Sequence, residues 1–303
     1  MRLPSRKDSG GEPSVATHNG AAVLLTIFSA ALNSAGGILV RSMDAASEWQ
    51  IVFWRAFALA VAISGIVWFE HRTALAQAMR RIGPWSLLGG MFYGVTLIGY
   101  VLALTNTTVA NADFTMSAIP IFTALFAWLV LGERVRMRTG LAIAAAVAGI
   151  GLMLGDGIAA GTLFGNAMAL LASVSFACFV IVLRKGQAID MLPTAVVGAA
   201  FATLVAAFMA EGDIKVSTED LALCLLWGGV ISCVAHFLIV TASRNLSGAE
   251  LTLLLLVEFI LGPVWVWLLI DETPSDLTLA GGAIVLAAVA GHALMSMRAQ
   301  TNT

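Results

Sequence analysis

The chain has 303 residues, of which 59% are hydrophobic and 11% are charged, and its formal net charge is −2. Soluble domains carry about 25% charged residues, so this chain has too few charges to cover a water-exposed surface. The composition excludes an ordinary soluble globular protein. Its long apolar runs approach the roughly 20 residues that cross a bilayer as a helix, which indicates a polytopic helical membrane protein.

The first twenty residues, 1–20, are polar and rich in Gly, Ser and Pro. This composition predicts a disordered tail. A cleavable signal peptide is the alternative, because a basic start precedes an apolar run. That run, about residues 21–40, is longer than a typical signal core, so we favour a retained first membrane span.

Apolar runs separated by short polar connections predict ten transmembrane helices. Pro84 and Pro193 fall where a helix tolerates proline, in its first turn, and therefore mark two of the helix starts. The expected ranges are 21–41, 49–69, 84–104, 109–131, 139–155, 163–183, 192–210, 220–242, 249–270 and 277–297.

Lys and Arg gather in the connections on one side of these spans, which predicts that this side is cytoplasmic. The other side collects acidic residues and has only Arg41 and Lys215 as bases. Both termini are then expected in the cytoplasm, and the expected location is the inner (plasma) membrane. The basic set is Arg2, Arg6, Lys7, Arg72, Arg80, Arg81, Arg134, Arg136, Arg138, Arg184, Lys185, Arg244 and Arg298.

A weak internal repeat relates TNTTVANADFTMSAIPIFTALFAWLVLGE (105–133) to RNLSGAELTLLLLVEFILGPVWVWLLIDE (244–272). Both copies carry a proline within the span, Pro120 and Pro263. Five spans per copy is an odd number, so the second copy enters the membrane from the opposite side, as in transporters with inverted repeats and a midplane site. The predicted organisation is a tail (1–20), a first five-helix repeat (21–156), an inverted second repeat (157–298) and a short cytoplasmic tail (299–303).

The Trp54-Arg55 pair, PIFTALFAWLVLGERV (120–135) and LVEFILGPVWVWLLIDE (256–272) resemble the drug/metabolite transporter superfamily in its ten-helix EamA-type branch. Within that branch the chain is most similar to the YddG-type exporters of aromatic amino acids and methionine. The resemblance implies a substrate cavity between the halves, lined by spans 1, 3, 4, 6, 8 and 9, with spans 5 and 10 peripheral. The second copy departs from the pattern by ending in Asp271-Glu272 instead of Gly-Glu.

Glu258 is an ionisable residue about ten residues into the ninth predicted span. A charged side chain at the centre of a membrane helix costs roughly 2.5–3.5 kcal/mol on insertion scales, so Glu258 is not expected to face lipid. It either points into a cavity, where it binds an ammonium group or carries a proton, or it stays neutral and hydrogen-bonded between helices. Pro263 removes a backbone hydrogen bond nearby, which either frees a carbonyl or only kinks the helix.

Arg55 and Asp113 lie one to two helical turns inside the outer ends of their spans. We expect a structural ion pair, between these two residues or between Arg55 and Glu48, in preference to a substrate carboxylate bound by Arg55. Pro120 and Pro263 join Arg55 and Asp113 as the residues with an expected structural or gating role.

Aromatic and uncharged polar side chains complete the candidate cavity lining. Tyr93 and Tyr100 are seven residues apart and share one helical face, where they either pack between helices, which we favour, or form a platform for an aromatic or apolar substrate. His236 aligns with Leu97 in the other repeat and either faces the same cavity or bonds a nearby carbonyl. The uncharged groups either hold helices together or hydrogen-bond a zwitterionic substrate, and they are Asn33, Ser34, Asn111, Ser173 and Ser175.

No sequence motif of a soluble enzyme is present: there is no HExxH pair, no P-loop and no metal spacing around Cys178, Cys224 and Cys233. We therefore expect no enzyme activity, no cofactor and no metal. The expected function is a secondary transporter that exports small amphipathic metabolites, chiefly amino acids, by alternating access. Another exported metabolite or drug, or a channel-like facilitator, is the alternative. The expected partners are a small-molecule substrate and the bilayer, without nucleic acid, and the expected state is a monomer.

Overall fold

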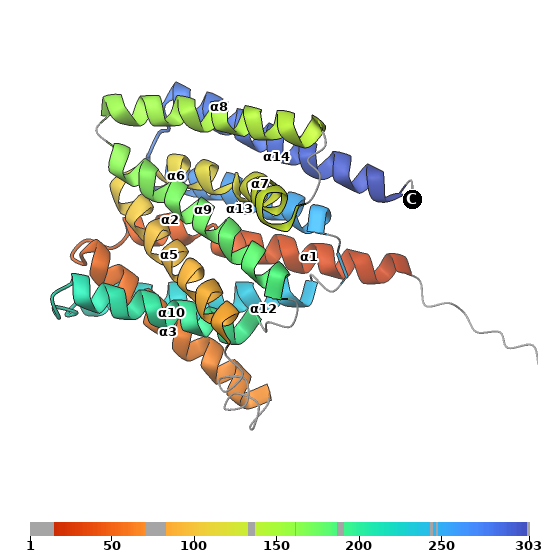
Figure 1. The fold of residues 1–303 in the computed structure, drawn as a ribbon. Coiled ribbons are helices and arrows are strands. Elements are labelled where there is room, and N and C mark those ends of the chain that lie inside the picture. The colour runs from red at the N-terminus through yellow and green to blue at the C-terminus, as the bar shows by residue number, and fades with distance from the viewer. Residues whose placement is uncertain are drawn as a thin grey trace, which may run out of the picture.

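A computed structural model describes residues 15–70, 83–132, 137–160, 162–186, 191–242, 245–246 and 248–301. All regular secondary structure in these ranges is helical (Figure 1). Residues 1–14 of the predicted tail (1–20) and many of the predicted cytoplasmic bases lie outside the described residues. The rest of that tail, residues 15–20, is not disordered as expected but forms the start of the first helix. The helices are α1 (Val15–Asn33), α2 (Gly36–Arg41), α3 (Glu48–Glu70), α5 (Pro84–Asn106), α6 (Val109–Met116), α7 (Ile119–Leu131), α8 (Met137–Ala160), α9 (Leu163–Gly186), α10 (Met191–Met209), α11 (Thr218–Leu225), η1 (Leu226–Ser232), α12 (Cys233–Ala242), α13 (Gly248–Ile270) and α14 (Asp276–Thr301).

Each of the ten predicted ranges coincides with one helix or with adjoining helical pieces. Eight of these are long and apolar enough to cross a membrane, whereas the apolar helices Thr139–Gly155 and Pro193–Met209 are shorter. Large apolar side chains point outward along the bundle, among them Leu24, Leu204 and Phe208, which are 69%, 70% and 81% exposed. Such a surface suits hydrocarbon, which supports a multi-pass membrane protein. The count of ten spans stays a prediction.

Three of the membrane-length segments are interrupted. The first breaks at Ser34, between α1 and α2, where the Ser34 hydroxyl donates to the Ala31 carbonyl at 2.7 Å. The second breaks at Ser117, between α6 and α7, and Pro120 lies in the first turn of α7, where its missing N–H is not needed. The third contains the π-helical turn η1 between α11 and α12. Pro120 therefore restarts a helix, whereas Pro263 lies inside the continuous helix α13.

The helices of the two halves pack on one another in related pairs. α3 packs on α10, α6 on α13 and α8 on α14, so the second, fourth and fifth segments of each half meet their counterparts. α5 packs on α9, and α1 packs on α12. In both pairs, the third segment of one half meets the first segment of the other half. Figure 1 shows α8 and α14 side by side at one edge of the bundle, away from α3 and α10.

Small residues bring some of these helices into backbone contact. A Cβ atom at Gly149 of α8 would lie 2.6 Å from the Gly281 carbonyl oxygen of α14, and the converse distance is also 2.6 Å. α5 and α10 meet in the same way, with a Cβ at Gly198 lying 2.7 Å from the Gly90 carbonyl oxygen. Gly90 and Gly281 therefore permit close packing of their helices.

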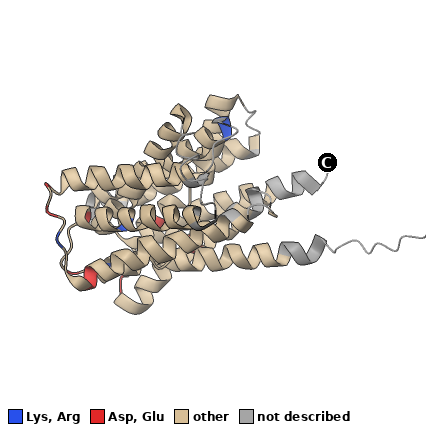
Figure 2. Ribbon diagram, turned by 90° about the horizontal axis from the view of Figure 1, so that it is seen from below, with Lys and Arg blue, Asp and Glu red and all other residues tan. Residues whose placement is uncertain are grey.

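Acidic residues gather at one end of the bundle, opposite the C-terminus (Figure 2). We call this the acidic end; it is formed by the connections at 42–47, 107–108, 210–217 and 271–275. Hydrogen bonds hold these connections together: the Gln50 amide donates to the carbonyls of Asp213 and Lys215, both at 3.0 Å, and the Ala45 N–H donates to Asp220 at 3.3 Å. The first turns of α1 and the last turns of α14 lie at the opposite end (Figure 1).

Candidate functional site

A cluster of charged and aromatic side chains lies inside the bundle, where α3, α5, α6, η1 and α13 approach one another. Arg55 of α3 is 8% exposed, and its guanidinium carbon lies 3.8 Å from the centre of the Trp227 ring and 5.9 Å from that of Tyr100. Both distances lie within the range of a cation–π interaction. The Arg55 Nε–H is buried and has no hydrogen-bond partner among the described residues.

The π-helical turn η1 explains how Arg55 is held. Gly228 lies directly against the Arg55 backbone carbonyl, and a Cβ atom there would collide with it. Trp227, 1% exposed, precedes this glycine and presents its ring to the guanidinium. π-Helical turns are rare and recur at functional sites. One turn of the second half therefore fixes both the backbone and the side chain of Arg55.

The expected ion pair of Arg55 with Asp113 or Glu48 is wrong for the described structure. Asp113 Oδ1 instead accepts a hydrogen bond from the Tyr100 hydroxyl at 2.8 Å, and its Oδ2 lies against Gly262 of α13. Glu48 accepts hydrogen bonds from Asn106 at 2.7 Å and from a neighbouring threonine. Each carboxylate thus has its own neutral donor, while Arg55 stacks on aromatic rings.

Glu258 faces this cluster from α13. It is half-buried and close enough to Arg55, Tyr100 and Asp113 to interact with them electrostatically. The side chain of Asn33, at the end of α1, hydrogen-bonds to the Glu258 carboxyl group. Glu258 therefore lies on the protein-facing side of α13, as the cost of exposing it to lipid required.

The predicted candidates Ser34 and Pro263 flank this contact between α1 and α13. Ser34 accepts a hydrogen bond from Trp265 Nε1 at 2.9 Å while its own hydroxyl bonds within α1. Pro263 follows Gly262, whose missing side chain makes room for Asp113. The sequence interpretation did not single out Trp265, and a tryptophan in an apolar run carries no signal of its facing.

Tyr93 and His236 form a second polar contact between the halves. The Tyr93 hydroxyl lies 2.7 Å from His236 Nε2, and His236 Nδ1 lies 2.7 Å from the Ser232 carbonyl oxygen. A carbonyl can only accept, so Nδ1 carries the proton and, in the neutral ring, Nε2 accepts from Tyr93. Tyr93 also packs against Phe176 and Phe179 of α9, with ring centres at 6.4 and 5.2 Å. His236 therefore bonds a nearby carbonyl, one of its two expected roles, whereas its facing of the substrate cavity stays a prediction.

Other predicted lining residues lie apart from the cluster. Asn111, 3% exposed, accepts from Thr278 of α14 at 2.7 Å and donates to Thr107 at 3.3 Å, so it joins helices. Ser173 of α9 donates to the Thr115 carbonyl at 3.0 Å. Ser175 is buried on the same helix. In the described ranges no group of three or more His, Cys, Asp or Glu side chains is placed to hold a metal ion.

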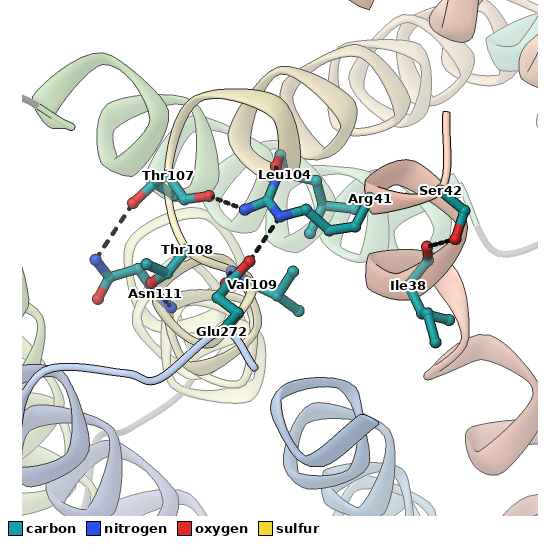
Figure 3. A network of polar contacts seen from close by, with 9 residues as sticks. All are labelled: Ile38, Arg41, Ser42, Leu104, Thr107, Thr108, Val109, Asn111 and Glu272. Atoms are coloured by element: carbon teal, nitrogen blue, oxygen red, sulfur yellow. Dashed lines mark hydrogen bonds and ion pairs between the residues drawn. The ribbon is translucent and has the colours of Figure 1, made fainter. Parts of the chain in front are cut away.

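A network at the acidic end joins the two halves (Figure 3). Arg41, the last residue of α2, donates from Nε to Glu272 Oε2 at 2.6 Å, from Nη1 to the Leu104 carbonyl at 2.5 Å and from Nη2 to the Thr107 carbonyl at 2.8 Å. Glu272 Oε1 accepts from the Val109 N–H at 2.7 Å, in the first turn of α6, where a helix favours negative charge. We call these five residues the clamp. The sequence placed Arg41 and Glu272 on one side of the membrane but did not pair them.

Comparison with known proteins finds similarity to transporters. Residues 20–155 match the model of the EamA-like transporter family. Two relatives, both named pseudopaline exporter CntI and found in two strains of Pseudomonas aeruginosa, are 25% identical over 274 residues, covering 88% of this chain and 93% of theirs. A protein of known crystal structure shares the fold with a TM-score of 0.62 and 18% identity, over 91% of this chain and 98% of that one. The chain is a multi-pass helical membrane protein whose first half matches a transporter family.

Proposed function

We propose that this protein is a secondary transporter of the EamA type that exports small amphipathic metabolites, amino acids first among them, across the inner membrane by alternating access. The family match over the first half and the exporter names of the two relatives support transport. The acidic end, with Arg41 and Lys215 as its bases, is proposed to face outward. The termini then lie in the cytoplasm.

The observation that carries this proposal is the way the halves pack. The pairs α3 with α10, α6 with α13 and α8 with α14 are unchanged when the halves are exchanged, and α5 with α9 becomes α12 with α1. Because each half contributes five segments, corresponding helices run in opposite directions through the membrane. Two such halves can exchange conformations and open a central site to either side in turn, which supports the inverted repeats 21–156 and 157–298.

The clamp supports the same mechanism. Arg41 and the α5–α6 connection belong to the first half, whereas Glu272 belongs to the second, so the network holds the acidic end closed. The cluster of Arg55, Trp227 and Glu258 lies deeper, beneath this closure. A carrier needs such a breakable seal on one side of its site, and an open pore does not.

The side chains of the interior suit a small amphipathic molecule. Among the described residues, Arg55 is the only arginine of the cluster, whereas a phosphorylated substrate such as a nucleotide sugar is held by several cationic groups. The aromatic rings of Tyr100 and Trp227 and the carboxyl groups of Asp113 and Glu258 make up the rest of the cluster. We therefore propose amino acids, including aromatic ones and methionine, acting through Asn33, Tyr93, Tyr100, His236 and Glu258.

The direct test uses purified protein in sealed vesicles loaded with a panel of labelled amino acids. A carrier gives efflux that saturates with concentration and speeds up when unlabelled substrate is present on the far side. Flux that rises linearly without this acceleration would identify a pore. Release of none of the amino acids above the rate of protein-free vesicles would overturn the amino acid assignment.

A further inference from the structure

Arg55 is a buried cation that forms no ion pair with any of the described carboxylates. A guanidinium group has five N–H donors and no acceptor, and a buried charge is normally paired and hydrogen-bonded because desolvation is costly. Arg55 is 8% exposed, its Nε–H has no partner in the described part of the chain, and the nearby Asp113 is bound to Tyr100. Stacking on Trp227 and Tyr100 offsets part of the cost but satisfies none of the N–H groups.

Glu258 is the complementary anion across the cluster. It interacts electrostatically with Arg55 but forms no ion pair with it in the described structure. One side of its carboxyl group is held by Asn33, and the side chain keeps partial exposure although it faces the protein interior. The two opposite charges are thus held apart by their helices, α3 from the first half and α13 from the second.

We infer that Arg55 binds the carboxylate, and Glu258 with Asn33 binds the ammonium group, of one zwitterionic α-amino acid substrate. This inference rests on the proposed function and names the subsites of its site. The planar guanidinium fork matches a carboxylate with two parallel hydrogen bonds. A substrate that carries both charges satisfies both buried groups at once and adds no net charge to the interior. Because Arg55 and Glu258 belong to different halves, the bound zwitterion also bridges the two halves whose relative movement exposes the site.

The two proposed subsites distinguish an amino acid from derivatives that lack its carboxylate or its ammonium group. L-phenylalanine has both charges, L-phenylalaninamide lacks the carboxylate, and N-acetyl-L-phenylalanine lacks the ammonium group. Each loss leaves one buried charge of the protein without its partner, which costs roughly ten- to a hundredfold in affinity. L-methionine and its two matching derivatives form a second set with a different side chain.

The experiment measures displacement of labelled L-phenylalanine or L-methionine from the purified full-length protein in detergent. The wild type is expected to bind either derivative roughly ten- to a hundredfold more weakly than the parent amino acid. Arg55→Gln is expected to weaken the parent and remove the preference over the amide, while the preference over the N-acetyl derivative remains. Glu258→Gln keeps the size of the side chain and its hydrogen bond to Asn33. It is expected to weaken the parent and remove the preference over the N-acetyl derivative, while the preference over the amide remains.

Two controls separate these effects from general damage. Arg184→Gln and Glu219→Gln make the same chemical changes at exposed positions, in the last turn of α9 and the first turn of α11, and are expected to keep wild-type selectivity. Arg55 also packs on Trp227, so Arg55→Gln can fail to fold. The Glu258→Gln variant and the wild-type preference between the two derivatives then decide the inference.

The outcomes are distinct. A wild type that binds and releases amino acids but accepts the amide or the N-acetyl derivative equally well overturns the zwitterion subsites and leaves the proposed function standing. The same conclusion follows if Arg55→Gln and Glu258→Gln weaken all three compounds by one common factor, because a purely structural role has that effect. A wild type that binds and transports no amino acid of either set overturns the amino acid assignment of the proposed function, on which the subsites rest.

Discussion

Arg41 and Glu272 meet at 2.6 Å and join the end of α2 to the segment that follows α13, although 231 positions separate them in the chain. Arg41 is 24% and Glu272 17% exposed, so the pair is shielded more than an ordinary surface ion pair. Its other bonds go to backbone groups at 104, 107 and 109, which makes it the centre of a network. In the proposed alternating-access cycle, the clamp stabilises the closed state of the acidic end.

Arg41→Gln is expected to favour opening of this end. The substitution removes the charge and at least two of the three charged hydrogen bonds of Arg41. Each of these bonds contributes at most about 1.5–3 kcal/mol, because the site is partly exposed. A shift of about 1.4 kcal/mol already changes the open population tenfold. The measurement is the rate at which Val109→Cys, a buried position of the clamp whose backbone N–H the substitution keeps, reacts with a membrane-impermeant thiol reagent.

Lys215→Gln is the matched control for the clamp, because Lys215 is an exposed base at the same end of the bundle. It is expected to leave the labelling of Val109→Cys unchanged. Equal labelling in Arg41→Gln and in the parent protein, across a range of substrate concentrations, would show that the clamp does not control this end. All comparisons are made with Cys178, Cys224 and Cys233 replaced by alanine.

Tyr93→Phe is expected to destabilise the protein by about 0.6 kcal/mol and at most about 1.7 kcal/mol, the range measured for side-chain hydrogen bonds between membrane helices. It removes the hydroxyl that lies 2.7 Å from His236 Nε2 and leaves the ring packing on Phe179 intact. A double-mutant cycle with His236→Leu isolates the pair. Strictly additive losses of unfolding free energy in that cycle would mean that the two side chains do not interact.

Hydropathy predicted the helical ranges well because in lipid every backbone group must be bonded within its own segment, and only a helix does this locally. It did not predict the breaks at Ser34 and Ser117 or the turn η1, because short polar side chains can satisfy freed backbone groups there. These interruptions depend on neighbouring helices, which hydropathy does not describe. The fold was therefore more predictable than its irregularities.

The interior cluster was predicted only in part. Glu258, Tyr100 and Arg55 stood out because charged and aromatic groups are costly or distinctive in a membrane segment. Asn111 has the same polarity but bonds Thr278, because facing depends on where α14 lies. Trp227 was missed because its apolar run reads the same as that of Trp267, which is 53% exposed. Which side of a helix faces the protein is decided by packing.

Gly262→Ala and Gly228→Ala are both expected to destabilise the protein, and Gly228→Ala is expected to have the larger effect. A Cβ atom at Gly262 would collide with the Asp113 carboxyl group, which can rotate at the expense of its bond to Tyr100. At Gly228 the collision is with the backbone carbonyl of Arg55, which can move only with α3. Overpacking of this kind costs about 1–3 kcal/mol, and the measurement is thermal unfolding in detergent.

Gly151→Ala is the control for both glycine substitutions, because no atom lies within 4 Å of a Cβ added there. In an open helical position alanine is favoured over glycine by about 0.5–1 kcal/mol, so this variant is expected to unfold at the same or a higher temperature. If Gly262→Ala behaved like Gly151→Ala, the close approach of α13 to Asp113 would be incorrect.

Pro263→Ala is expected to stabilise the resting protein and slow its turnover. Proline inside a helix removes one backbone hydrogen bond and costs about 3 kcal/mol, so α13 gains a bond to the carbonyl four residues earlier when alanine replaces it. The same bond resists bending of the helix that carries Glu258. Pro84→Ala is the control, because Pro84 lies in the first turn of α5 and its replacement restores no interior bond. The measurement pairs thermal unfolding with the maximal rate of exchange in vesicles: a higher unfolding temperature with an unchanged rate would remove any role of Pro263 in the conformational cycle.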